Sequence, residues 1–200
     1  MTLSSVTRRL LCKASFLALA CAGLTHSAIA QEAPRVKFVT NAGEFVVEVY
    51  PDKAPKTVEN FLQYVRDKHY DGTIFHRVIA NFMVQGGGYD QRYIERRTRA
   101  PVEHEGREAL AKGGPRNTVG TLAMARTNAP HSATAQFFIN VVDNGFLDPS
   151  PQQPGYTVFG KVVSGMETVQ KIRSVPTGFG GPFPSDVPQT PIVIQSARLL

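Results

Sequence analysis

The sequence contains no tryptophan, and its two cysteines both lie within the first 21 residues. Its five histidines include no His-x-His or His-x-x-x-His pair. A zinc site needs about four closely spaced thiolate, imidazole or carboxylate ligands, so we expect no metal site and no structural disulfide in the folded domain. The glycine run at residues 86–88 lacks the Gly-Lys-Ser/Thr of a phosphate loop, and no Gly-x-Ser-x-Gly elbow of a serine hydrolase is present.

Long hydrophobic runs are also absent. No apolar run approaches the roughly 20 residues that span a bilayer, so we expect no stable membrane anchor. The run at residues 16–24 instead follows three basic residues and precedes Ala28-Ile29-Ala30, a small-x-small cleavage site. This order is typical of a secretory signal peptide, so we expect residues 1–30 to be removed and a domain over residues 31–200 to be periplasmic.

Two alternatives remain open for this leader. Arg8 and Arg9 also resemble a twin-arginine export signal, although paired basic residues are common in ordinary signal peptides. Cys21 is a candidate for lipidation, but the residues before it fit poorly and the later Ala-Ile-Ala site fits well. The sequence therefore does not decide the export route.

The leader changes the charge balance of the chain. It holds three of the 22 Lys and Arg residues and no Asp or Glu, which leaves 19 basic against 16 acidic residues and lowers the net charge from +6 to +3. Such a small excess does not indicate a nucleic-acid footprint, even around the arginine-rich residues 92–99, so we expect no nucleic-acid partner. The ~170 remaining residues suit one domain with a single core.

Short clusters of β-branched and aromatic residues, separated by glycine and proline, predict a β-rich fold. Period-two alternation predicts a hairpin over residues 36–50 and further strands near residues 75–85, 119–125, 136–142, 156–163 and 192–199. Helical spacing of apolar residues predicts helices over residues 55–68 and 165–172. We expect irregular connections over residues 90–115 and 176–191.

One strand-like stretch contains a charge that needs an explanation. In an extended strand, Phe75, Arg77 and Ile79 share one face and His76 lies on the other. A guanidinium among apolar side chains is costly unless function uses it, so we interpret this stretch as one wall of a binding pocket. Taken alone, Arg77 could also be a structural ion-pair residue. We expect His76 to be a structural histidine with its hydrogen bonds satisfied, and the glycines after Gln85 to end the strand.

Three sequence blocks carry a resemblance to a known family. They are Phe-His-Arg at residues 75–77 with Phe-Met-Val-Gln-Gly-Gly at 82–87, Gln-Phe-Phe-Ile-Asn at 136–140, and Val-Phe-Gly-Lys-Val at 158–162. In this order they resemble the cyclophilin family of peptidyl-prolyl cis-trans isomerases, from about residue 36 to the C-terminus. The resemblance implies a mainly β fold, a closed eight-stranded antiparallel β-barrel capped by two α-helices, and an enzyme that needs no cofactor.

The resemblance also implies a reaction and a set of site residues. Rotation about an X-Pro bond faces a barrier of ~18–20 kcal/mol that amide resonance imposes. Arg77 would donate a hydrogen bond to the imide nitrogen of the twisted peptide, which favours the transition state. Gln85 and Phe82 would complete the catalytic group, with Gln85 holding Arg77 or the substrate carbonyl. The positions that would bind a proline-containing, unfolded or extended polypeptide are Met83, Ala125, Arg126, Gln136, Phe138, Phe146, Leu147 and Tyr156.

The chain departs from the family pattern at two of these positions. Phe146 lies where many eukaryotic members have tryptophan, and Tyr156 lies where many have histidine. These departures resemble bacterial secreted members and predict weak cyclosporin binding. An alternative function is a proline-peptide binding module or holdase chaperone that uses the same pocket without catalysis. We expect a monomer.

Overall fold

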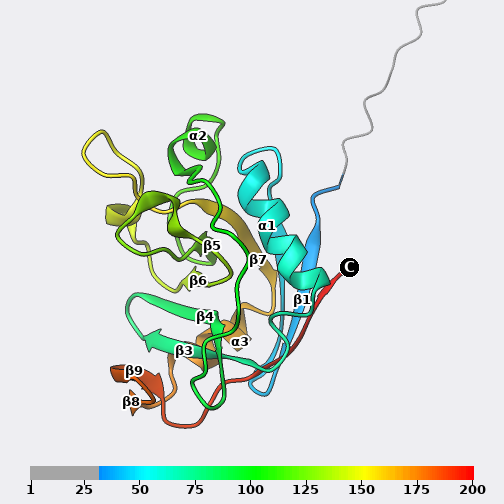
Figure 1. The fold of residues 1–200 in the computed structure, drawn as a ribbon, viewed down its shortest axis with the longest axis vertical. Helices are drawn as coiled ribbons and strands as arrows, with labels where there is room; N and C mark the ends of the chain where they lie inside the picture. The colour runs from blue at the N-terminus through cyan, green and yellow to red at the C-terminus, as the bar shows by residue number, and fades with distance from the viewer. Residues whose placement is uncertain (1–31) are drawn as a thin grey trace, which may run out of the picture. The chain divides into compact units, whose positions relative to one another are not determined.

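An eight-stranded antiparallel sheet dominates the computed structural model, which describes residues 32–200 (Figure 1). The strand order is β10-β1-β2-β7-β5-β6-β4-β3. The strands are β1 (Arg35–Thr40), β2 (Gly43–Val49), β3 (Thr73–Ile79), β4 (Met83–Asp90), β5 (Thr121–Met124), β6 (Phe137–Asn140), β7 (Val158–Ser164) and β10 (Ile194–Leu199). The predicted signal peptide lies outside the described residues.

The sheet closes on itself, which confirms the predicted antiparallel barrel. Ile74 in β3 pairs with Val193, next to β10, and the Phe75 N–H donates to the Ile192 carbonyl at 2.9 Å. The β1–β2 hairpin shows the alternation expected from the sequence, because Val36 and Phe38 face inward and the positions between them are more exposed. Inward side chains of all eight strands therefore share one interior.

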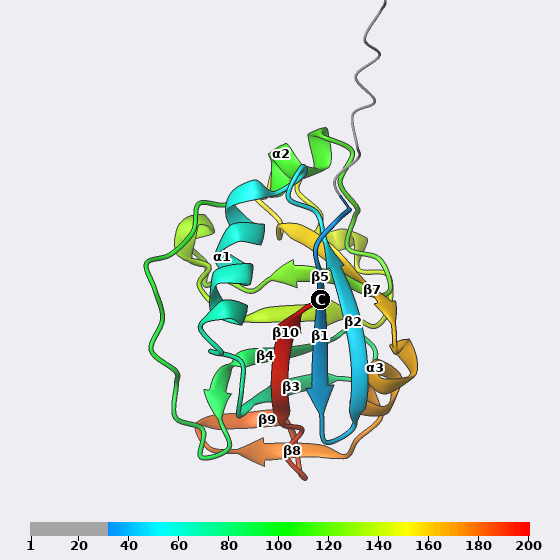
Figure 2. The same ribbon diagram turned by 90° about the vertical axis from the view of Figure 1, so that its right-hand side faces the viewer.

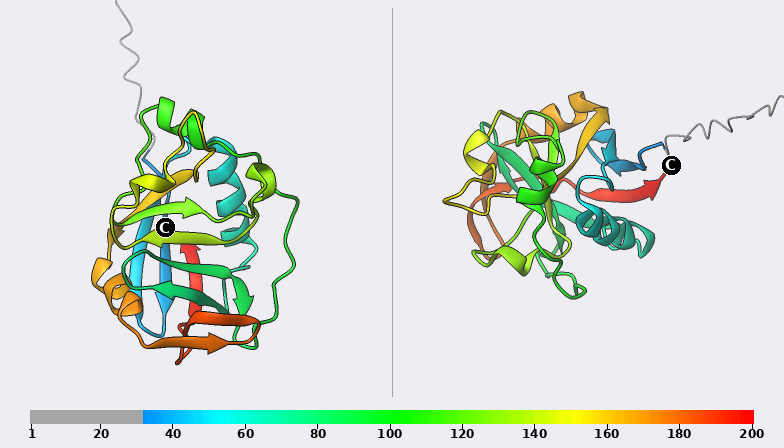
Figure 3. Two further views of the ribbon diagram at one scale, coloured as in Figure 1. Left: turned by 90° about the vertical axis from the view of Figure 1, so that its left-hand side faces the viewer. Right: turned by 90° about the horizontal axis from the view of Figure 1, so that it is seen from above.

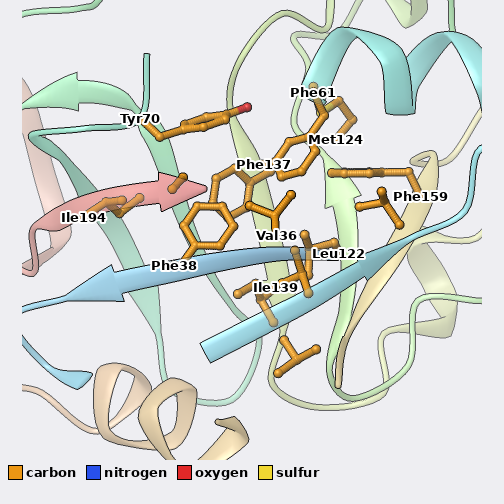
Figure 4. Close-up of a cluster of buried hydrophobic side chains, with 14 of the residues drawn as sticks. Val36, Phe38, Phe61, Tyr70, Leu122, Met124, Phe137, Ile139, Phe159 and Ile194 are labelled. Carbon is orange, nitrogen blue, oxygen red and sulfur yellow. The ribbon is translucent and has the colours of Figure 1, made fainter. Parts of the chain in front are cut away.

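Aromatic rings fill this interior (Figure 4). Phe38 stacks on its cross-strand neighbour Phe45, with ring centroids 4.9 Å apart and planes within 5°. Phe61, Phe137 and Phe159 complete the cluster, and the Phe61 and Phe137 rings meet edge to face at 6.0 Å. Such pairs add about 0.5–1.5 kcal/mol each beyond the burial of their area.

Helices pack against the barrel on opposite sides (Figure 2). Helix α1 (Pro55–Arg66) packs against β10, and its buried residues lie at the predicted helical spacing. Helix α3 (Met166–Arg173) packs against β2 and β4. Both predicted helices are therefore present. No helix within residues 32–200 is long and apolar enough to cross a membrane.

A third helix, α2 (Gly106–Ala111), lies in the segment expected to be irregular. Glu105, which precedes it, is 3% exposed and connects it to the N-terminus of α1. The Glu105 carboxylate accepts hydrogen bonds from the Lys56 N–H at 3.1 Å and from the Thr57 N–H and hydroxyl, both at 2.7 Å. Ala54, the N-cap residue of α1, supplies no side-chain acceptor, so a residue about 50 positions away caps the helix.

A second departure lies in the segment 176–191, where we expected an irregular connection. Strands β8 (Thr177–Gly180) and β9 (Phe183–Pro188) form a separate two-stranded hairpin there. The hairpin packs against β3 at one end of the barrel (Figure 3, orange). A two-stranded hairpin is marginally stable alone, so this contact with the barrel stabilises it.

We predict that Glu105→Ala lowers the free energy of unfolding by roughly 2 to 3 kcal/mol, because two backbone N–H groups and a buried hydroxyl lose a charged acceptor. Chemical denaturation of the folded domain measures this change. Glu103→Ala is the matched control, since Glu103 is exposed and bonds only the Lys56 side chain. An equal loss in both variants would contradict the capping role of Glu105.

Candidate active site

An extra residue on β3 decides where Arg77 lies. Phe75 pairs with Gly86, whereas Arg77 pairs with Gln85, so two steps along β3 match one step along β4. Phe75 and Val78 both belong to the barrel core, while Arg77 lines the cavity outside it. The prediction that Phe75 and Arg77 share a face was therefore wrong. A β-bulge reverses the alternation and turns the guanidinium out of the core.

A cavity of about 490 Å³ lies beside this bulge. The structure places ten of the eleven predicted site residues along its wall, with Phe146 as the exception. Its apolar part is formed by Met83 and Phe138, both buried, together with Leu147 and half-buried Phe82. Segments from β4, β6 and the loop after β6 thus meet around a site of the size that binds small ligands or a short peptide.

Arg77 is half-buried at the edge of this apolar surface. The ion pairs found within residues 32–200 do not include it, so no carboxylate there lies within 4 Å of its guanidinium. The structural ion-pair interpretation of Arg77 was therefore wrong for the described part of the chain. Its five N–H donors face a cavity that can hold an acceptor.

Gln85 and Gln136 are joined across two strands. The Gln85 amide nitrogen donates to Gln136 Oε1 at 3.0 Å. Gln85 therefore holds Gln136, and no hydrogen bond joins it to Arg77 within residues 32–200. Gly88 makes room for this pair, since a Cβ at that position would lie 2.5 Å from the Gln136 side chain. The glycines after Gln85 lie within β4 and do not end the strand as predicted. Because they lack a Cβ, side chains from neighbouring segments, such as Phe75 and Gln136, can pack directly against the strand backbone.

Tyr156 and Arg126 form another part of the cavity wall. The Tyr156 ring meets Phe138 edge to face at 5.4 Å, and the Arg126 guanidinium carbon lies 4.6 Å from the centroid of the Tyr156 ring. Arg126 also donates from Nε and Nη2 to the Gly155 carbonyl, at 3.1 and 2.8 Å. The Ala125 N–H donates to the Gln136 carbonyl at 3.0 Å. These contacts fix the wall before any ligand binds.

A buried polar network holds the loop that carries Leu147. Asn144 donates from Nδ2 to the Phe82 carbonyl at 2.9 Å and to Asn140 Oδ1 at 2.8 Å. Asp148 Oδ1 accepts from the Asn117 N–H and Nδ2, at 2.8 and 2.9 Å. The sequence suggested only turns for Asn144 and Asp148, because their partners come from distant segments. The network keeps Leu147 9% exposed at the cavity wall.

Phe146 occupies the rim rather than the interior of the cavity. Its side chain is 65% exposed, and its ring stacks on Phe82 with centroids 5.7 Å apart and planes 22° apart. The pair lies on the short 3-10 helix Gly145–Leu147 and the turn before β4. Phe146 is therefore placed to touch a ligand that extends beyond the cavity.

Sequence reasoning missed three cavity residues, His76, Tyr89 and Phe183. The His76 ring lies 4.8 Å from the Tyr89 ring and 5.4 Å from the Phe183 ring. Contrary to expectation, His76 Nδ1 is buried without a hydrogen-bond partner in the described part of the chain. Burial lowers the pKa of His76 to about 4; a backbone contact with Ile74, too weak in geometry to count as a hydrogen bond, opposes this shift, and the charge of the adjacent Arg77 adds to it. The sequence held only one indication of this part of the cavity, namely that His76 lies within the Phe-His-Arg motif.

A closed barrel with a half-buried arginine, which has no ion pair within residues 32–200, beside a partly apolar cavity of peptide size is the arrangement of a β-barrel peptide-binding protein. The chain belongs to the cyclophilin type peptidyl-prolyl cis-trans isomerase family, whose model matches residues 35–199. The resemblance inferred from the three sequence blocks is thereby confirmed. The protein is accordingly a peptidyl-prolyl cis-trans isomerase.

Similar proteins support this assignment. Peptidyl-prolyl cis-trans isomerase B of Escherichia coli is 52% identical over 167 residues, covering 82% of this chain and 98% of that protein. The isomerase cyp18 of Streptomyces antibioticus is 52% identical over 168 residues with the same coverage of both chains. A cyclophilin type isomerase of Cryptosporidium parvum shares the fold, with a TM-score of 0.66, 24% identity, and coverage of 84% of this chain and 98% of that one.

We predict that His76 makes stability depend on pH between about 6.5 and 4. The folded pKa of His76 is lowered, so the unfolded chain takes up its proton first as the pH falls through this window. The free energy of unfolding should fall by roughly 3 kcal/mol from this residue alone. Denaturation at pH 7 and pH 4 measures it.

His76→Phe provides the matched control, since phenylalanine fills similar space and does not titrate. His69 and His104 also have pKa values lowered by burial, but they contribute equally in both proteins. The variant should therefore lose less stability between the two pH values than the wild type. Equal losses would show that His76 is not the cause.

Proposed function

We propose that Arg77 accelerates X-Pro rotation by donating a hydrogen bond to the imide nitrogen. The observation that carries the proposal is the guanidinium without an ion pair, held by the β3 bulge at the edge of the apolar surface formed by Met83 and Phe138. As the peptide twists, resonance is lost and the nitrogen becomes an acceptor. The hydrogen bond then strengthens only near the transition state, which lowers the barrier without covalent chemistry.

The cavity supplies the other requirements of this mechanism. The proline ring would lie on Met83, Phe138 and Leu147, where water is excluded and the charge of Arg77 acts more strongly. Gln136, fixed by Gln85, would hold the extended chain beside it. A Cryptosporidium parvum cyclophilin with this fold was determined in the presence of the dipeptide Ala-Pro, which supports a proline-containing peptide as the ligand.

We further propose that the enzyme acts on exported proteins in the periplasm. The support is the leader pattern of residues 1–30, in which basic residues, an apolar run and an Ala-Ile-Ala site follow in order. Slow isomerisation of X-Pro bonds limits folding for tens to hundreds of seconds, so a catalyst in that compartment would shorten the exposure of unfolded chains.

We predict that Arg77→Ala lowers kcat/KM for an Ala-Pro-containing peptide by about 10²- to 10³-fold, the effect of removing one preorganised donor. The isomerisation rate, followed by NMR exchange or a protease-coupled assay, measures it. Arg92→Ala is the matched control, because the Arg92 side chain is 80% exposed, pairs with Asp90 and does not line the cavity. Full activity in a folded Arg77→Ala protein would refute the proposed role.

Arg77→Ala together with a further variant, Phe138→Ala, distinguishes an isomerase from a holdase that only binds its clients. A holdase would suppress aggregation of unfolded clients through the apolar cavity, independently of Arg77. Suppression that survives Arg77→Ala and is lost in Phe138→Ala would favour the holdase. Loss of isomerisation in both variants, with no suppression by the wild type, supports catalysis.

We also predict weak cyclosporin binding. Phe146 offers no N–H donor at the rim, and Tyr156 is already engaged by Phe138 and Arg126. One equivalent of cyclosporin should leave most of the isomerase activity in the same assay. Complete inhibition at one equivalent would contradict this prediction.

A further inference from the structure

The cavity extends beyond the surface assigned to the proline ring. The aromatic rings in and beside it form separate groups: Phe82 pairs with Phe146 at the rim, Phe138 pairs with Tyr156, and a third group surrounds His76. The third group consists of His76, Tyr89 and Phe183, with neighbouring centroids 4.8 to 5.4 Å apart. We call it the aromatic subsite. It begins one residue from Arg77 along β3, and the proline surface needs none of its members.

In this subsite, His76 has a ring nitrogen that finds no hydrogen-bond partner among residues 32–200. Its side chain is 3% exposed, yet Nδ1 lacks a partner within the described residues, although the imidazole lines the cavity. A buried polar atom without a hydrogen bond is destabilising and rare in folded proteins. A peptide backbone offers both an N–H donor and a carbonyl acceptor, so an extended ligand can pair with Nδ1 in either neutral tautomer once the ring turns this buried atom toward the cavity.

Phe183, the third member of the aromatic subsite, lies on the β8–β9 hairpin, whose position is fixed by packing. Its ring meets Tyr89 edge to face at 5.1 Å, and the turn before it packs against Tyr93, where a Cβ at Gly181 would lie 2.3 Å from the ring. Tyr93 itself holds a positive φ of 61°, which its position between strand and hairpin maintains. The wall is thus formed before a ligand arrives, which reduces the entropy lost on binding.

We propose that His76, Tyr89 and Phe183 form a second substrate subsite, which receives a large apolar or aromatic side chain within two residues of the proline while His76 Nδ1 bonds the substrate backbone. The inference rests on the proposed binding of proline at Met83 and Phe138. It assigns to the enzyme a preference for clients in which an aromatic residue lies close to proline. Arg77, between the two subsites, would then act on a peptide held at both ends.

A peptide scan on the wild-type protein tests the inference directly. Short peptides with a central Ala-Pro bond carry a single phenylalanine at the position before that alanine or at one of the two positions after proline, with alanine elsewhere. At one position, phenylalanine should raise kcat/KM by about tenfold, the scale expected for burying one large apolar side chain. The ¹⁵N resonance of His76 Nδ1 should shift when that peptide binds.

Variants on one hairpin locate the preference. Phe183→Ala should abolish the tenfold ratio between the preferred and the all-alanine peptide. Phe179→Ala should preserve it, because Phe179 is on the same hairpin, is 84% exposed and does not line the cavity. The wild-type scan stands by itself if Phe183→Ala does not fold.

The outcomes separate this inference from the proposed function. Isomerisation of every peptide at the same kcat/KM would overturn the aromatic subsite and leave the catalytic role of Arg77 intact. A preference that Phe183→Ala retains, or an unchanged His76 resonance, would also overturn it. Absence of activity toward all peptides, including the all-alanine one, would instead refute the proposed function.

Discussion

A single extra residue on β3 is the constraint on which the site depends. Without the bulge, strict alternation would direct Arg77 to the same side as Phe75, into an interior of packed aromatic rings. A guanidinium there would lose its hydration with no carboxylate to compensate it. The bulge keeps Phe75 in the core and places Arg77 at the boundary, where its charge is partly desolvated but still accessible. Strand pairing therefore sets both the stability of the barrel and the position of the proposed donor, Arg77.

The walls around Arg77 are rigid for different physical reasons. Aromatic packing fixes Phe138 and Tyr156, a buried network of Asn144 and Asp148 fixes the Leu147 loop, and the glycine-lined face of β4 fixes Gln136. Each support depends on a contact between segments that are distant in sequence, such as Asn144 with Phe82 and Asp148 with Asn117. An enzyme that stabilises a twisted amide needs this rigidity, because a donor that moves with the substrate would stabilise both states equally.

The sequence predicted those parts of the structure that local patterns determine. Alternation located the β1–β2 hairpin, helical spacing located α1, and the family resemblance located ten residues that share one cavity, six of them within its motif blocks. The sequence-based prediction failed where contacts between distant segments determine the structure. Helix α2 has six residues, too few to be stable without the Glu105 contact, and the β8–β9 hairpin forms from a glycine- and proline-rich segment because β3 covers it. The unpaired Nδ1 of His76 likewise depends on neighbours that no local pattern reveals.

Barrel closure has a consequence for an enzyme proposed to act on unfolded chains. Strands with free N–H and C=O groups recruit extended polypeptides by continuing the sheet, which would trap a client or seed aggregation. The Ile74 and Val193 pairing joins the last two edges of the main sheet within residues 32–200. The small β8–β9 hairpin keeps edges, but Pro184 and Pro188 in β9 have no N–H to offer. Clients can therefore engage through side chains in the cavity and leave again without a backbone ladder to break.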